Sequence, residues 1–111
     1  MELKVENRAG EIAVVRLAGR LDLLSAADVK QGLSKAVSDG RRRLVVDLAE
    51  VGFIDSSGLG ALIGGLKAAR LAGGDLRIAG AGDQARVILE LTTLDRVLRP
   101  YSTVEEALSG Y

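Results

Sequence analysis

The chain has 111 residues, with 15 basic and 15 acidic side chains and neither cysteine nor histidine. The zero net charge argues against a nucleic-acid partner, because nucleic-acid binding surfaces are positively charged. Without cysteine or histidine there are no disulfides, no usual zinc sites and no Ser-His-Asp or Cys-His hydrolysis. No apolar run nears the roughly 18 residues that span a bilayer, and no signal peptide is recognisable. We therefore expect one cytoplasmic domain over residues 1–111, without membrane insertion.

The first part of the chain predicts a β-hairpin. Residues 2–7 alternate between polar and apolar side chains, residues 7–10 (Asn-Arg-Ala-Gly) are typical of a turn, and residues 11–17 return as a second strand. Alternation on both sides of a turn indicates two antiparallel strands.

A first helix is expected to begin at Ser25. Asp28 stands three residues later, as in a capping box, and Leu24 and Val29 are spaced as a hydrophobic staple. Gly40 is the expected stop of this helix. Its predicted buried face consists of four apolar residues at helical spacing, Val29, Leu33, Ala36 and Val37.

The next segment combines a buried strand with a polar helix start. Residues 44–46 (Leu-Val-Val) predict a strand covered on both faces, and a loop then leads to Asp55, Ser56 and Ser57, which offer N-cap chemistry. An anion at a helix start is stabilised by about 0.3–1 kcal/mol, so a phosphate is well placed there. Plain helix capping is the alternative interpretation. The helix that follows carries an apolar stripe of Leu59, Leu62, Ile63 and Leu66.

The remaining chain alternates strands and helices. We expect a strand at 75–79, a helix capped by Asp83, a last strand kept short by Pro100, and a closing helix capped by Ser102 or Thr103. The middle helix is expected to bury Val87, Ile88 and Leu91. The order β-β-α-β-α-β-α-(β)-α predicts an α/β fold, with a mixed, mostly parallel sheet opened by a hairpin and flanked by about four helices.

Two stretches suggest phosphate binding, but a structural role is favoured for each. Residues 80–85 (Gly-Ala-Gly-Asp-Gln-Ala) fit the dinucleotide pattern Gly-x-Gly-x-x-Gly/Ala, yet too little chain follows for a dinucleotide-binding half. A tight strand-to-helix turn is favoured, and a small nucleotide-binding enzyme using Gly80 is a remote alternative. Residues 41–43 are three arginines, for which a solvated loop is favoured.

No catalytic residue, cofactor site or metal site is predicted. Lys67, the base nearest in sequence after Ser56, lies about three turns along the same helix, roughly 16 Å away. No acidic residues are spaced like a calcium-binding loop.

Four glycines in or near the same helix call for an explanation, since each interior glycine costs about 1 kcal/mol relative to alanine. Close packing on the sheet and close approach of a partner are both open explanations. The glycines are Gly58, Gly60, Gly64 and Gly65.

Several blocks together resemble a known family. Residues 55–60 (Asp-Ser-Ser-Gly-Leu-Gly) are similar to the signature of the bacterial anti-sigma factor antagonists, which are STAS domains. Residues 17–22 (Leu-Ala-Gly-Arg-Leu-Asp) resemble the family's segment after the second strand, and residues 91–95 and 103–107 resemble its later blocks, all in the family's order.

The resemblance implies a regulatory binding protein. In the family, the unphosphorylated antagonist binds an anti-sigma factor, usually a serine kinase, and so frees the sigma factor. The kinase then phosphorylates the serine after the signature aspartate, which corresponds to Ser56, and a serine phosphatase restores it. By the same resemblance, Asp22 is the loop aspartate beside the switch, and a partner-binding loop contains Asp55, Ser57, Gly58 and Gly60. ATP and magnesium would belong to the kinase.

The fold leaves other regulatory roles open. STAS domains also serve in stress-signalling assemblies and as cytosolic subunits of lipid-transport complexes, and the sequence does not choose between these roles and a sigma-factor circuit.

Overall fold

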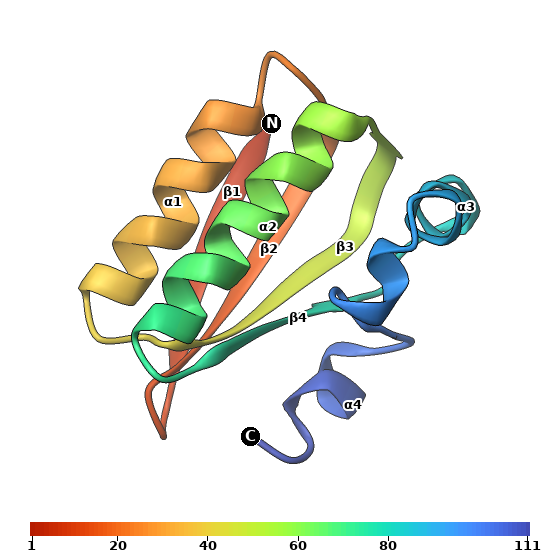
Figure 1. The fold of residues 1–111 in the computed structure, drawn as a ribbon. Helices are drawn as coiled ribbons and strands as arrows, with labels where there is room; N and C mark the ends of the chain where they lie inside the picture. Colours follow the sequence, from red (N-terminus) through yellow and green to blue (C-terminus); the bar gives the residue numbers. More distant parts are fainter.

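A computed structural model describes all residues 1–111 (Figure 1). It contains five strands, four helices and one short 3₁₀ turn. In chain order these elements are β1 (Glu2–Arg8), β2 (Ile12–Leu21), α1 (Ala26–Ser38), β3 (Arg43–Ile54), α2 (Ser56–Leu71), β4 (Asp75–Ala79), α3 (Asp83–Leu91), η1 (Leu94–Arg96), β5 (Pro100–Tyr101) and α4 (Val104–Leu108).

The strands form one mixed sheet in the order β1-β2-β3-β4-β5. β1 is antiparallel to β2, and every other neighbouring pair is parallel. Helices α1 and α2 lie side by side on one face of the sheet, and α4 packs against the other face (Figure 1). The predicted fold class and element order are confirmed. None of the helices is long and apolar enough to cross a membrane.

The two faces of the sheet bury separate apolar clusters. The larger, of 23 buried residues, lies under α1 and α2, and the smaller, of five, lies under α4. In β3, Leu44 and Val46 point into the larger cluster and Val45 into the smaller one. A strand buried on both faces needs a continuous apolar run, which is why Leu-Val-Val predicted it correctly.

The predicted loop between the central strand and the second helix is wrong, because β3 continues to Ile54. β2 likewise runs on to Leu21, so that the block of residues 17–22 lies mostly within the strand. The two strands stay paired through Leu21 and Ile54, with register shifts after Arg16 and Gly19. The extended part of β3 includes exposed positions such as Gly52, which is why the sequence alone suggested a loop.

The predicted start of α1 is wrong in its details. The Ser25 hydroxyl donates to the carbonyl oxygen of Arg20 (2.7 Å) and accepts from the N–H of Asp22 (3.0 Å), and so it stabilises the preceding turn instead of capping the helix. Leu24 is 91% exposed and forms no staple. The predicted inner face is confirmed by burial of Val29, Leu33 and Ala36, as is the stop at Gly40, which has a φ of +94°.

The predicted buried face of α3 is also wrong. Ala85 and Leu89 are the buried residues, whereas Val87 and Leu91 are exposed and Ile88 is partly buried. Gly82, not Asp83, occupies the N-cap position. The helix buries the stripe that contains Ala85 and Leu89. Its short sequence was equally compatible with burial of the stripe that contains Val87, Ile88 and Leu91.

The end of the chain follows the prediction. β5 has only two residues, as expected from Pro100, and the Thr103 hydroxyl caps α4 by accepting from the N–H of Glu106 (3.1 Å).

Candidate functional site

The family-signature residues lie at the carboxyl ends of the neighbouring strands β2 and β3. Leu21 and Ile54 are paired in the parallel register, so Asp22 and Asp55 leave the sheet at the same level. The N–H of Asp55 donates to the carbonyl oxygen of Leu21 (3.2 Å), which joins the two strand ends directly. The structure therefore brings together Asp22 and the Asp55–Gly60 segment, which are far apart in sequence.

Asp55 alone provides the N-cap of α2. Its backbone is extended, and its Oδ1 accepts from the N–H of Gly58 at 2.9 Å. Ser56 is the first helical residue and is exposed, whereas Ser57 is half-buried. Neither serine hydroxyl takes part in a hydrogen bond with the rest of the protein, so neither contributes to capping. The Ser56 hydroxyl is therefore free at a positively polarised helix start.

Asp22 builds the turn between β2 and α1. Its Oδ1 accepts from the N–H of Leu24 (3.1 Å), and its Oδ2 lies 3.4 Å from Nε of Arg20. The Arg20 guanidinium in turn lies over the ring of Phe53 on β3, 4.2 Å from its centre. Two strands thus hold this turn in place.

The same turn presents two leucines to solvent. Leu23 is 74% exposed and Leu24 is 91% exposed. Sequence reasoning missed both, because it placed Leu24 in a staple under α1. Contiguous exposed apolar surface marks protein-binding sites, so these two leucines are candidates for contact with a partner.

Two glycines of α2, Gly58 and Gly60, have opposite surroundings. A Cβ atom at Gly58 would collide with the carbonyl group of Leu21 and lie 2.7 Å from its Cγ, so glycine there lets the helix start pack against β2. A Cβ atom at Gly60 would meet nothing within 4 Å, and Gly60 is exposed. Packing on the sheet explains Gly58, therefore, but not Gly60.

The electrostatics of the site are set by the start of α2 and two acidic residues. Asp55 caps a helix start whose partial positive charge favours an anion, and Asp22 follows the end of the neighbouring strand. No group of three or more acidic residues lies close enough together to hold a metal ion.

The Gly80 turn is held by side chains of the chain itself. Gly80 has a φ of +70°, which favours glycine, and Arg86 donates to the carbonyl oxygen of Ala81 at 3.2 Å. The Gln84 amide bonds to the backbone of Ile54. These residues join α3 to the sheet, as expected for a structural strand-to-helix turn.

Two of the three arginines at 41–43 also have structural side-chain contacts. Arg41 donates to the carbonyl oxygen of Arg8 (3.0 Å), and Arg42 forms an ion pair with Glu11. They tie the start of β3 to the hairpin, so the solvated-loop interpretation understated their role.

The chain belongs to the STAS domain family, whose model matches residues 3–107. It is 34% identical over 95 residues to an anti-sigma-B factor antagonist of Staphylococcus aureus, with 85% of this chain and 88% of that protein covered. It is 31% identical over 101 residues to the anti-sigma-F factor antagonist RsfB of Mycobacterium tuberculosis, with 89% and 80% covered.

The solved structures agree. An anti-sigma factor antagonist from Mycobacterium paratuberculosis superposes with a TM-score of 0.85 at 30% identity, covering 97% of this chain and 91% of that one. By their names these relatives are regulatory binding proteins and not enzymes.

Proposed function

We propose that this chain is an anti-sigma factor antagonist whose partner is a serine kinase, and that phosphorylation of Ser56 switches binding off. The observation that carries the proposal is the position of Ser56, which is exposed with an unbonded hydroxyl at the start of α2. The names of the relatives support the antagonist role. The chain supplies the substrate serine, and the kinase supplies ATP and magnesium.

The partner surface that we propose surrounds Ser56. It combines Asp22 and the exposed Leu23 and Leu24 of one turn with the exposed Ser56 and Gly60 of α2. Leucines supply apolar area to an interface, and the open space at Gly60 lets a partner backbone come close. Gly58 contributes indirectly, since it sets the position of the helix start against β2.

The switch follows from charge. A phosphoserine adds about −1.5 to −2 charge and three acceptor oxygens. In the free protein this charge is exposed at a helix N-terminus, where it is tolerated. In the complex it would be desolvated beside the Asp22 and Asp55 carboxylates. A penalty of about 3 kcal/mol weakens binding more than a hundredfold, with no change of fold.

A reversible switch also needs an enzyme that removes the phosphate. We propose a serine phosphatase for this step, acting on the exposed Ser56, and a cytoplasmic site of action beside the sigma factor.

Phosphosite mapping with the partner kinase tests the proposal. The kinase with ATP is expected to modify wild-type protein and Ser57→Ala at Ser56, and to leave Ser56→Ala unmodified. Ser56→Ala should bind the kinase as tightly as wild type does. The half-buried Ser57 is the matched control, since it is a serine one position deeper in the same helical turn. Modification of Ser57 alone, or tight binding by fully phosphorylated protein, contradicts the switch.

A further inference from the structure

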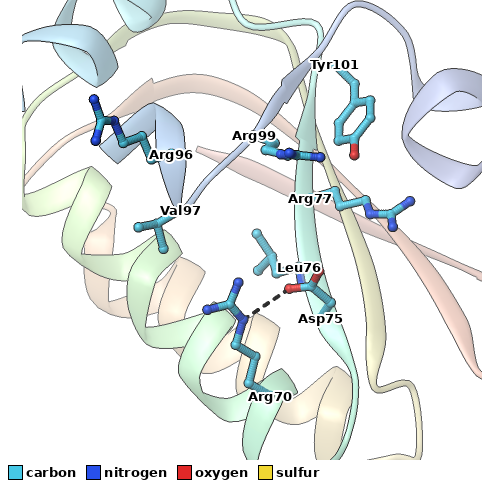
Figure 2. Close-up of a pocket in the computed structure, with 8 residues that line it drawn as sticks. All are labelled: Arg70, Asp75, Leu76, Arg77, Arg96, Val97, Arg99 and Tyr101. Carbon is cyan, nitrogen blue, oxygen red and sulfur yellow. Dashed lines mark hydrogen bonds and ion pairs between the residues drawn. The ribbon is translucent and has the colours of Figure 1, made fainter. Parts of the chain in front are cut away.

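A second polar site lies beside the start of β4, at the other end of the strands from the proposed switch. An open cavity of about 210 Å³ is lined by the end of α2, the start of β4 and the segment from η1 to β5 (Figure 2). Its charged lining consists of four arginines and one carboxylate: Arg70, Arg77, Arg96, Arg99 and Asp75. Ser56 and Arg70 stand at opposite ends of α2, about 21 Å apart along the helix.

Pro100 creates this cavity. β5 pairs with β4 only through Pro100 and Tyr101, opposite Ile78 and Ala79, so the first residues of β4 have no neighbour on that side. Proline has no N–H for a longer ladder. The uncovered start of β4 forms the floor of the cavity at Leu76 (Figure 2).

Two of the arginines stand side by side across this gap. Arg77 and Arg99 each directly precede a residue of the pair Ile78–Pro100, so their backbones lie at the same level, while the Arg77 guanidinium is turned away from Arg99 in Figure 2. Like charges in such neighbouring positions repel each other. Arg77 is held in place by the carbonyl oxygens of Ala107 (2.8 Å) and Ser109 (3.0 Å).

Asp75, the single carboxylate in the lining, does not neutralise the four arginines. Oδ1 of Asp75 accepts from Nε of Arg70 (3.3 Å) and from the N–H of Leu76 (2.9 Å). Arg96 and Arg99 are exposed and have no hydrogen bond or ion pair with the protein. Arg96 stands on the rim with its guanidinium turned outward in Figure 2. These two side chains can therefore turn toward an added anion without breaking any contact.

We infer that this cavity binds a phosphate-bearing anion, held by Arg99 and Arg96 beside Arg77 and Arg70. Guanidinium groups bind phosphate oxygens with paired N–H donors. The cavity is smaller than the roughly 300–1,000 Å³ of pockets that enclose a drug-sized ligand, so it would hold the phosphate and leave the rest of a larger compound outside. An extended acidic peptide is disfavoured, because Asp75 already occupies the N–H of Leu76 at the strand edge.

Titration of the full chain with pyrophosphate, followed by NMR, tests the inference. Saturable shifts are expected at the amides of Leu76, Val97 and Arg99, with sodium chloride at equal ionic strength producing none. Inorganic phosphate should bind more weakly than pyrophosphate because it carries less charge. The variant R96Q/R99Q should bind at least about tenfold more weakly, because it loses two charged donors. Its melting temperature should hardly change, since neither side chain forms a hydrogen bond or an ion pair with the protein.

Two further variants distinguish binding at this cavity from nonspecific electrostatic attraction of the anion. Arg99→Lys keeps the charge but not the paired donors, and should show part of the loss. Arg8→Gln removes an arginine from β1, the edge strand on the far side of the sheet from β5, and should bind as wild type does. Sedimentation with phosphatidic-acid vesicles distinguishes the source of the phosphate. Binding to both probes supports a lipid headgroup, and binding to pyrophosphate alone supports a free phosphate compound. No saturable pyrophosphate binding, or equal binding by R96Q/R99Q, overturns the inference.

Discussion

Gln84 on α3 bonds to both backbone polar groups of Ile54, the last residue of β3. Its Nε2 donates to the carbonyl oxygen of Ile54 (2.8 Å), and its Oε1 accepts from the N–H (2.9 Å). The pairing of β3 with β4 ends at Asp47 and Ala79, so no strand reaches Ile54 from that side. The amide of Gln84 takes the place of the missing strand, one residue before Asp55 and two before the proposed phosphorylation site.

Gln84→Ala is expected to lower the free energy of unfolding by about 1–2 kcal/mol, since two hydrogen bonds are lost. Chemical denaturation measures this change. Amide hydrogen exchange should become faster at Asp55 and Ser56, because the strand end that positions them is released. The control is Glu90→Ala on the same helix, whose exposed side chain forms no hydrogen bond and should change stability by less than about 0.5 kcal/mol. Equal stability of the two variants contradicts the anchoring role.

Gly58 and Gly60 should respond oppositely to the same substitution. Gly58→Ala forces a Cβ atom into the Leu21 carbonyl group and should destabilise the fold by about 1–3 kcal/mol. Gly60→Ala points into open space and should stabilise the helix by up to about 1 kcal/mol. Thermal melts of the two variants give the comparison.

Gly60→Arg extends the test to binding. The protein should melt cooperatively, because nothing lies within 4 Å of the new Cβ atom. Its binding to the anti-sigma factor should be lost. Unfolding by Gly60→Arg would make this glycine a packing residue and remove it from the proposed surface.

Leu24→Ser should weaken partner binding by about tenfold or more, since burying a leucine contributes about 1.5–3 kcal/mol. Stability should hardly change, because Leu24 is almost fully exposed. The measurement is titration calorimetry with the anti-sigma factor. Leu71→Ser is the matched control, with 90% exposure at the far end of α2. If both variants bind alike, the turn of Leu23 and Leu24 is not part of the interface.

Ser56→Asp should melt near the wild-type temperature, because the start of α2 accommodates an added carboxylate. Its binding to the partner should be weaker than that of Ser56→Ala, although one carboxylate only partly imitates a phosphate dianion. Affinity measured on both variants decides this. Binding of Ser56→Asp as tight as that of Ser56→Ala would count against a switch based on charge.

Tyr111 is expected to make the free energy of unfolding fall at alkaline pH. Its hydroxyl donates to the carbonyl oxygen of Leu44 (2.8 Å), and burial, with a smaller effect of Asp75, raises the pKa of the phenol. The unfolded phenol loses its proton near pH 10, whereas the folded one keeps it. Because the unfolded state then binds fewer protons, this contribution is fully present below about pH 10 and falls as the pH rises further.

Denaturation of wild type and Tyr111→Phe across this range provides the test. The stability difference between them should be constant up to about pH 9 and should shrink at about pH 11. A difference that does not vary with pH would show that the Tyr111 phenol has its ordinary pKa.

Much of the fold could be predicted because its signals are local. The apolar spacing of α1, the bounds of β4, the cap of α4 at Ser102 or Thr103 and the short β5 depend on a few neighbouring residues. The structure agrees with each and selects Thr103 as the cap. The helix start at Ser56 belongs to the same class, since capping is decided within one turn.

Other features depended on contacts between distant segments. The face that α3 buries, the extension of β3 to Ile54 and the exposure of Leu24 depend on which segment lies opposite each residue. Periodicity within a single segment does not specify that neighbour.

The sequence by itself determined the family, the order of the elements and the position of Ser56 at a helix start, because repeated local patterns and a family signature carry that information. Only the tertiary structure decided that Gly58 packs against Leu21 while Gly60 faces open space, and that Arg77 and Arg99 stand together across a gap in the sheet. In a sequence, one glycine cannot be told from another glycine, nor one arginine from another arginine. Their roles differ because folding places different atoms beside them.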